Sequence, residues 1–325
     1  MSTKKALKTG NTKPLNKQTK MPLFVVIGPT ASGKSEFAVK LAKKIGGEII
    51  SADSRQVYQG LDIGSGKVEG KWNKGVYTYK GVTHFLIDVA SPRRQFSVVK
   101  FQSQARAAIA EIYARGHIPI ICGGTAQWVD AVVFGHNLPS VKPNAELRAK
   151  LEKLTTAQMF AKLRKLDPAR ARGIDANNPR RLVRALEIVM TTGKPVPKLQ
   201  TDASAIYKSE FDVTWIGLNP DLNNEGMPFL EKKINKRLQE RLNPKLKVNI
   251  ISEVKNLRKE LSWKRLESFG LEYKFGALFL QNKITREELD EQLFRAIRQY
   301  AKRQLTWWKR NKNIRWYADA SKVSI

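Results

Sequence analysis

Short apolar runs and stretches of helical periodicity alternate along the first part of the chain. Residues 23–27 form an unbroken apolar run that predicts a buried strand, and the run ends at Gly28. Apolar positions at helical spacing over residues 37–45 predict a helix that a pair of glycines ends. A second strand is expected at residues 48–51. This part of the chain therefore predicts a strand, a helix and a strand in succession.

The same alternation continues further along. Apolar runs at residues 84–89 and 118–122 flank a helical stretch that extends from about residue 98 to 115. Strands that alternate with helices form parallel sheets with both faces covered. The sequence therefore predicts an α/β fold built on a doubly wound parallel sheet.

The chain changes character after the fourth expected strand. Residues 140–210 are dense in lysine, arginine, leucine and alanine, which predicts an all-helical insertion. Residues 211–218 predict a strand that returns to the sheet, and helices are expected over most of the remainder. We therefore expect one α/β core with C-terminal helices, made of residues 22–139 and 211–325.

Net charge narrows the class of partner. The chain has 59 lysine and arginine residues against 29 aspartate and glutamate residues, a formal net charge of +30. A field of this sign concentrates nucleic acid, and neutralisation of phosphates makes the binding salt-dependent. Charge alone leaves a generally basic proteome or an anionic membrane surface as alternatives.

The ends and the cysteine content indicate the compartment. Residues 1–21 contain lysines but no acidic residue and no apolar stretch, which is typical of a basic disordered tail. The single cysteine, Cys122, has no partner for an intramolecular disulfide, which fits a reducing compartment. No run predicts a signal peptide or a membrane span, so a cytoplasmic protein is expected.

The strongest chemical signal is a glycine-bearing loop directly after the first strand. It matches the pattern G-x-x-x-x-G-K-[ST] between a strand and a helix, as in P-loop NTPase-like folds. Backbone N–H groups of such a loop face a phosphate, the lysine reaches its oxygens and the serine binds magnesium. The predicted phosphate-binding residues are Gly28, Pro29, Thr30, Ala31, Ser32, Gly33, Lys34 and Ser35, with Ser35 as the ligand of Mg²⁺.

Two other strand ends carry polar residues. Asp53 follows the second strand, and Thr125 follows the run at residues 118–122. Ligand sites of doubly wound sheets lie beyond the carboxyl ends of the strands, so both side chains are expected beside the loop. Asp53 suits a helix cap as well as a catalytic role, and Thr125 suits a turn as well as a binding role.

These motifs occur in the same order in tRNA dimethylallyltransferases. The chain resembles that family through G-P-T-A-S-G-K-S, S-A-D-S-R-Q-V-Y-Q-G-L-D-I-G and G-G-T, and through N-P-R-R-L-V-R-A-L-E and Y-A-K-R-Q-L-T-W further on. The resemblance covers about residues 22–312. It implies transfer of a dimethylallyl group from dimethylallyl diphosphate to the exocyclic amine of the adenosine 3′-adjacent to the anticodon in tRNA, with release of diphosphate.

The resemblance also implies roles for single residues. Asp53 takes a proton from the amine, Thr125 hydrogen-bonds the bridging oxygen or the base, and Arg237 is a further cation for diphosphate. An aryl amine is a poor nucleophile, so a positioned carboxylate helps, and the stacked target base must flip out. The residues expected to contact the anticodon stem-loop are Asp53, Ser54, Arg55, Gln56, Thr125, Arg148, Arg180, Arg181, Leu182, Val183 and Arg184. The alternative for the helix arginines is a solvated helix face.

Other interpretations stay open. A P-loop kinase of a nucleoside or small metabolite would use Asp53 toward a hydroxyl, and an RNA-dependent ATPase would use Asp88 in a Walker-B-like role. Tryptophans among basic residues near the C-terminus suit stacking on RNA or anchoring of the last helix. Ala126-Gln127-Trp128 departs from the usual family pattern and predicts a reshaped prenyl pocket. One site per chain suggests a monomer.

Overall fold

The computed structural model describes residues 20–136, 138–197, 211–224 and 226–323. Almost the whole expected basic tail, and residues 198–210 of the expected insertion, lie outside these residues. The sheet has the strand order β3-β4-β5-β2-β6-β1-β7-β8. Its strands are β1 (Met21–Ile27), β2 (Gly47–Ser51), β3 (Lys71–Asn73), β4 (Val76–Tyr79), β5 (Val82–Phe85), β6 (Ile118–Gly123), β7 (Phe211–Leu218) and β8 (Arg315–Tyr317).

The sheet is mixed, which corrects the prediction of a purely parallel one. Strands β5, β2, β6, β1, β7 and β8 pair in parallel, as the alternation of strands and helices predicted. The exception is an edge hairpin, in which β3 and β4 pair antiparallel and β4 pairs antiparallel with β5. The hairpin strands are short and largely exposed, so they lack the apolar run that marked the buried strands.

One expected strand is displaced. The apolar run at residues 84–89 predicted a strand there, but β5 ends at Phe85. Leu86 and Asp88 have φ of 60° and 55°, and this left-handed backbone cannot continue a strand. Strand β8, near the C-terminus, was not predicted from the sequence, because it has only three residues.

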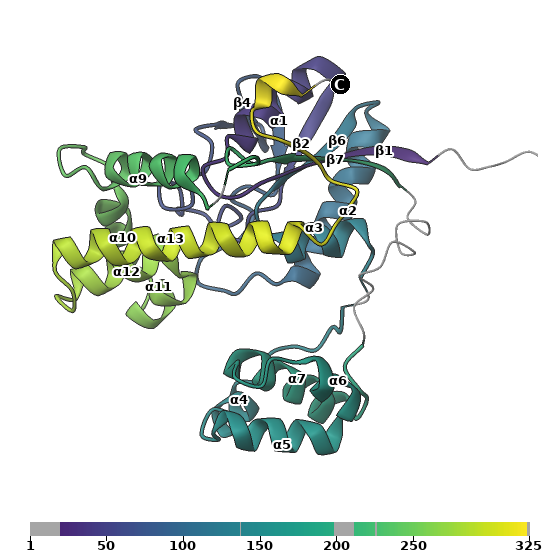
Figure 1. Cartoon of the computed structure of the whole chain (residues 1–325), viewed down its shortest axis with the longest axis vertical. Helices are drawn as coiled ribbons and strands as arrows, with labels where there is room; N and C mark the ends of the chain where they lie inside the picture. Colours follow the sequence, from purple (N-terminus) through teal and green to yellow (C-terminus); the bar gives the residue numbers. More distant parts are fainter. Residues whose placement is uncertain (1–19, 137, 198–210, 225, 324–325) are drawn as a thin grey trace, which may run out of the picture.

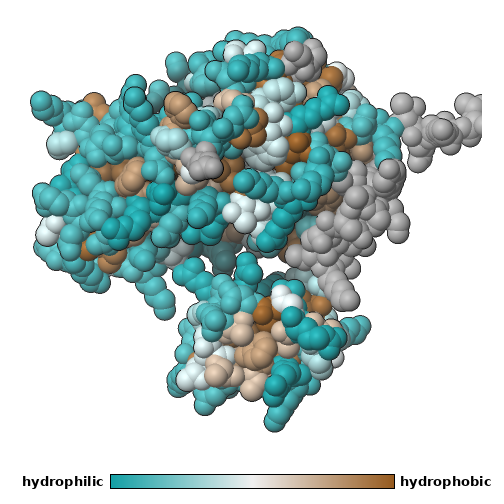
Figure 2. Space-filling model, viewed as in Figure 1, coloured by the Kyte–Doolittle hydropathy of each residue, from teal (hydrophilic) through white to brown (hydrophobic). Residues whose placement is uncertain are grey.

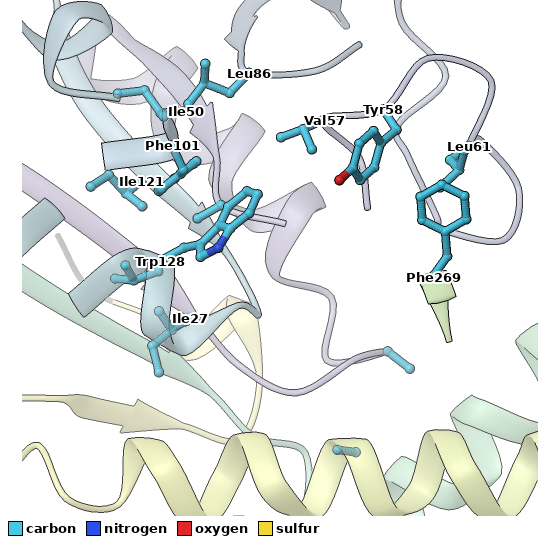
Figure 3. Close-up of a cluster of buried hydrophobic side chains, with 14 of the residues drawn as sticks. Ile27, Ile50, Val57, Tyr58, Leu61, Leu86, Phe101, Ile121, Trp128 and Phe269 are labelled. Atoms are coloured by element: carbon cyan, nitrogen blue, oxygen red, sulfur yellow. The ribbon is translucent and has the colours of Figure 1, made fainter. Parts of the chain in front are cut away.

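Helices cover both faces of the sheet. Helix α1 (Lys34–Ile45) packs Phe37 and Leu41 on one face, together with Val26 of β1. Helices α2 (Val98–Ala114) and α3 (Ala126–Val133) cover the other face, where Val25 and Ile27 of β1 point. Alternate residues of a strand face opposite sides, so an unbroken apolar run is required in β1. Figure 3 shows Phe101 of α2 and Trp128 of α3 side by side in this core, with ring centroids 4.3 Å apart.

The C-terminal third forms a helical layer beside the carboxyl ends of the strands (Figure 1). Its long helix α13 (Arg286–Trp308) packs on α3, α9 (Pro228–Leu242) and α12 (Leu271–Leu280). Trp308 at the end of α13 is 1% exposed and packs against Trp215 of β7, so this tryptophan anchors the helix and does not face RNA. The helices are α9 (Pro228–Leu242), α10 (Ile250–Arg258), α11 (Trp263–Phe269), α12 (Leu271–Leu280) and α13 (Arg286–Trp308), followed by a short 3-10 helix, Ala320–Lys322.

Four helices between β6 and β7 form a unit of their own (Figure 1). They are α4 (Ala145–Leu151), α5 (Thr156–Leu166), α6 (Pro168–Gly173) and α7 (Pro179–Thr192). Their apolar side chains form a separate core around Leu163, Leu182 and Leu186. Asp167 caps α6 by accepting the N–H of Arg170, and it also accepts the N–H of Val196. This second bond fixes the segment that follows α7 to the start of α6.

A buried ion-pair cluster holds this unit together. The Glu187 carboxylate on α7 has no exposed side-chain surface and receives two bonds of 2.8 Å from Arg148 on α4 and one of 2.6 Å from Arg184. Burial opposes ionisation, but hydrogen bonds from Arg148, the N–H of Asn144 and Arg184 outweigh it and lower the pKa of Glu187 from 4.5 to about 2. The charged carboxylate is therefore part of the folded unit.

We expect Glu187→Gln to destabilise the helical unit by about 3 kcal/mol, because two arginines lose their shared counter-charge. The wild-type unit should also lose stability as pH falls from 4.5 toward about 2, since a carboxylate with a depressed pKa stabilises only while ionised. Amide hydrogen exchange of α4 and α7 measures both effects. Glu146→Gln, at an exposed carboxylate paired only with Lys150, is the control and should change protection little. Equal protection in the two variants would contradict this role of Glu187.

The surface is largely hydrophilic on the face drawn in Figure 2. Within the part of the chain that the structure describes, every helix is either too short or too polar to cross a bilayer.

Candidate active site

The glycine-bearing loop lies where the sequence predicted it, between β1 and α1. Gly33 has φ of 88° and Ala31 φ of 63°, so the loop turns sharply into the helix. A Cβ on Gly28 would stand 2.5 Å from the carbonyl oxygen of Leu218 and 2.6 Å from Oγ of Ser32, so only glycine fits there. The first N–H groups of a helix have no intrahelical acceptor and carry the positive end of its dipole. The loop therefore presents an anion-binding concavity.

Two side chains of the loop support an anionic ligand. Among the described residues, the buried hydroxyl of Ser32 has no hydrogen-bond partner. Lys34 donates to the carbonyl oxygen of Pro29 at 3.2 Å, and burial, with a smaller effect of Arg237, lowers the pKa of its ammonium group. Buried polar groups are normally paired. The oxygens of a phosphate would accept hydrogen bonds from the Ser32 hydroxyl and from the Lys34 ammonium group.

Ser35 occupies the first turn of α1 and is half-buried. No group of three or more carboxylate, histidine or cysteine side chains in the described ranges is arranged to hold a metal ion. At phosphate sites Mg²⁺ keeps water and phosphate oxygens and needs only one or two protein ligands. The hydroxyl of Ser35 therefore fits a magnesium ion that arrives with a phosphorylated ligand.

Asp53 and Thr125 meet beside this loop, because β2 and β6 are neighbouring parallel strands. Oγ1 of Thr125 accepts the N–H of Ser54 at 3.0 Å, and the N–H of Thr125 donates to the carbonyl oxygen of Ala52 at 3.1 Å. Oδ1 of Asp53 accepts the N–H of Arg55 at 2.8 Å. Its Oδ2 accepts no hydrogen bond from the described residues. The turn role and a chemical role of Asp53 are thus compatible, since one oxygen fixes the turn and the other stays available.

Helix α13 adds two residues that sequence reasoning did not assign. Burial and then the charge of Asp53 raise the pKa of the Tyr300 phenol to about 12, and its hydroxyl lies within hydrogen-bond reach of Thr125. Gln304, one turn further, is 5% exposed and bridges two loops. Its Oε1 accepts the N–H of Thr30 and its Nε2 donates to the carbonyl oxygen of Gly124, both at 2.9 Å. The two positions lie in the motif Y-A-K-R-Q-L-T-W, but nothing in that motif shows which loops they contact.

We expect Gln304→Met to lower kcat/KM for the phosphorylated substrate about tenfold, which corresponds to about 1.4 kcal/mol. The substitution leaves the N–H of Thr30 and the carbonyl of Gly124 without partners, so the two loops lose their shared support. Gln299→Met, at an exposed position of the same helix, is the matched control. Steady-state kinetics with thermal unfolding distinguish local misplacement from unfolding, and unchanged kinetics would remove Gln304 from the site.

A second feature that the sequence did not reveal is a carboxylate clamp from α10. Glu253 accepts the N–H groups of Asp62, Ile63 and Gly64 at 2.6 to 3.2 Å, and the hydroxyl of Tyr273 at 2.8 Å. Both side chains are buried. The hydroxyl of Tyr273 also accepts the N–H of Ser65. The clamp fixes residues 62–65 beside the site.

Arg237, for which the resemblance implied a role as a further cation, lies next to the loop. It lines a pocket with Thr30 and Ala31, and it retains an exposed surface there. Partial removal from water, and then the charge of Arg241, lower the pKa of Arg237 to about 10. The pocket also contains Glu272, a buried carboxylate whose pKa burial raises.

The residues predicted to contact tRNA divide into two groups. Asp53, Ser54, Arg55, Gln56 and Thr125 lie at the strand ends. Arg148 and the run 180–184 lie on α4 and α7, in the separate helical unit.

Within the helical unit, Arg180 and Arg181 are exposed in the first turn of α7, while Arg184 is occupied by Glu187. The prediction is corrected for Leu182 and Val183. They are 0% and 7% exposed in the core of the unit, so both side chains pack inside the protein and present almost no surface to RNA.

Asp88 does not occupy a Walker-B-like position. Its carboxylate pairs with the buried Nζ of Lys67, which also contacts Asp62 at 2.5 Å. The Asp88 backbone, at φ of 55°, lies past the end of β5. The Asp88 carboxylate is therefore committed to Lys67 and does not support the hydrolytic role that the ATPase interpretation gave it.

The fold and the site define an α/β protein with a glycine-bearing loop between β1 and α1, beside which a carboxylate and a hydroxyl from neighbouring strand ends lie. The sequence profile of the IPP transferase family matches residues 56–311, and that of an isopentenyl transferase family matches residues 21–76. The chain belongs to the IPP transferase family.

Named relatives agree with this assignment. A tRNA dimethylallyltransferase of Caldanaerobacter subterraneus subsp. tengcongensis is 36% identical over 91% of each chain. A tRNA dimethylallyltransferase 2 of Treponema denticola is 41% identical over 88% of this chain and 91% of its own. The solved tRNA isopentenylpyrophosphate transferase of Bacillus halodurans is 35% identical with a TM-score of 0.63, covering 92% of this chain and 90% of its own. A eukaryotic dimethylallyltransferase solved acting on tRNA is 25% identical with a TM-score of 0.69, covering 93% and 75%.

Proposed function

We propose that the protein transfers a dimethylallyl group from dimethylallyl diphosphate to the exocyclic amine of the adenosine 3′-adjacent to the anticodon of tRNA. The observation that carries the proposal is the placement of Asp53 and Thr125 beside a loop shaped for phosphate, in a chain of the IPP transferase family. A loop alone indicates phosphate binding. The added carboxylate and hydroxyl supply what transfer from a diphosphate to an amine requires.

In the proposed reaction the bond between C1 of the prenyl group and the diphosphate oxygen breaks, and a bond from C1 to the adenosine amine forms. The free Oδ2 of Asp53 accepts the proton that the amine loses. Thr125 uses its oxygen to accept the N–H of Ser54, and its O–H, which lies beside the Tyr300 hydroxyl, would turn to donate to the bridging oxygen. Lys34 and Arg237, with the N–H groups of the loop, stabilise the charge that develops on the leaving diphosphate. A magnesium ion held by Ser35 would add Lewis-acid stabilisation of the same charge.

The proposed tRNA surface includes the helical unit. Arg180 and Arg181 are exposed at the start of α7, and the net charge of +30 favours a polyanion. We assign the insertion, residues 140–210, to tRNA binding, and residues 22–139 and 211–325 to the catalytic core. The adenosine must leave the stacked anticodon loop to reach Asp53, so binding includes base flipping. One site per chain makes a monomer sufficient.

The test is transfer of radiolabelled dimethylallyl groups to unmodified tRNA in the presence of Mg²⁺, with nucleotide turnover measured in parallel. Label is expected in tRNA that has adenosine 3′ of the anticodon, and not in the same tRNA with guanosine at that position. Removal of Mg²⁺ by EDTA should strongly reduce the transfer. Phosphorylation of a nucleoside, or RNA-stimulated ATP hydrolysis without label in tRNA, would instead support the kinase or ATPase alternative.

A further inference from the structure

The pocket beside the loop contains a second arginine that has no assigned role. Arg237 and Arg241 are four residues apart on α9, so they project from the same side of the helix. The same pocket is lined by Thr30 and Ala31 of the glycine-bearing loop. Only 21% of the Arg241 side chain is exposed, so this cation is held largely inside the protein.

The two guanidinium groups converge on one small region. A Cβ built on Gly66 would lie 2.3 Å from Nη2 of Arg241 and 3.4 Å from Nη2 of Arg237. Gly66 directly follows the segment that Glu253 and Tyr273 hold. The carbonyl oxygen of Gly66 accepts a hydrogen bond from Nε2 of Gln56 at 3.2 Å. The backbone at Gly66 therefore lies against both guanidinium groups, and a side chain at position 66 would displace that of Arg241.

The carboxylate in the pocket, that of Glu272, does not form a close ion pair with Arg241. The carboxylate nearest to Arg241 is that of Glu272, and the closest N–O distance is 4.0 Å, too long for a hydrogen bond. Lys34 adds a third cation next to Arg237. Like charges repel, and partly buried arginines normally have close anionic partners. The excess positive charge therefore favours a multivalent anion in this pocket.

A diphosphate carries several anionic oxygens on two phosphoryl groups, so the arginines beside the loop can add donors to those that the loop provides. Guanidinium groups bind phosphate oxygens in pairs of parallel hydrogen bonds. We propose that Arg241, together with Arg237, binds a phosphoryl group of the donor diphosphate beside the loop. This inference rests on the proposed function for the identity of the donor. The diphosphate-binding role of Arg241 is separable from transfer.

The test is titration calorimetry of the full-length protein with inorganic diphosphate and Mg²⁺, in the absence of tRNA. We expect Arg241→Met to weaken diphosphate binding about 10- to 100-fold, the effect of losing hydrogen bonds to a charged group. Arg241→Lys should recover part of the affinity. The KM for dimethylallyl diphosphate should rise in parallel, while the KM for tRNA stays within about twofold. Lys232→Met, at an exposed lysine of the same helix, should bind as wild type does.

The double variant Arg241→Met/Glu272→Gln decides between binding and structural neutralisation. If Arg241 binds diphosphate, the double variant stays as weak as Arg241→Met. Recovery of wild-type affinity would overturn the proposal, because it would show that Arg241 only neutralises Glu272. Wild-type affinity in folded Arg241→Met would overturn it as well. Failure of the proposed function looks different, since the wild-type protein would then bind diphosphate without labelling tRNA.

Discussion

Replacing Asp53 with asparagine is expected to lower kcat for prenyl transfer by about 10²- to 10⁴-fold, the usual contribution of a positioned general base. Asparagine keeps an oxygen that can accept the N–H of Arg55, so the turn at this strand end persists while the proton acceptor is lost. Single-turnover transfer to tRNA measures the chemical step directly. Diphosphate affinity should change little, because Asp53 does not contact the loop through any hydrogen bond in the described structure.

Asp212→Asn is a suitable control, because it makes the same chemical change at an exposed position on β7. The control should retain wild-type rates. A rate for Asp53→Asn within a few-fold of wild type would show that the carboxylate shapes the turn and takes no proton.

Replacing Lys34 with methionine is expected to reduce kcat/KM for dimethylallyl diphosphate by about 10²- to 10³-fold, the cost of removing one preorganised charge donor. Lys34 lies among the loop N–H groups, and burial lowers its pKa, so the folded protein gains no stability from its charge. Thermal stability should therefore stay equal or rise. The combination of lost activity with retained stability is the signature of a ligand-binding cation.

Both the transfer assay and titration with inorganic diphosphate measure this effect. Lys40→Met, at an exposed lysine on the same helix, is the control. If Lys34→Met binds diphosphate as tightly as wild type, the loop does not hold the donor in the way proposed.

Local sequence patterns predicted the elements that carry the chemistry. The apolar run of β1, the glycine-bearing loop and the periodic helix α1 are contiguous, so their order is contained in about 25 residues of sequence. Asp53 and Thr125 were predicted to meet because each directly follows a strand, and neighbouring parallel strands end at one edge. Arg237 came from the family resemblance, and the structure places it beside the loop.

Several predictions failed or fell short because burial depends on partners from other parts of the chain. Leu182 and Val183 occur in a basic run that favours RNA contact, yet packing of α5 against α7 buries both. The edge hairpin of β3 and β4 has short, exposed strands without a periodic signal. Trp308 occurs among basic residues, but contact with Trp215 of β7 places it in the core.

The sequence by itself determined the glycine-bearing loop between β1 and α1, the strand ends that carry Asp53 and Thr125, and the helical insertion, because each depends on residues close together in the chain. The tertiary structure alone decided what supports and completes the site. Gln304 contacts Thr30 across 274 positions, and Glu253 contacts Gly64 across 189. The approach of Arg241 to Glu272 likewise depends on how α9 and α12 each pack on α13. No local periodicity encodes such pairings, since they form only when helices from the end of the chain close over strands from its beginning.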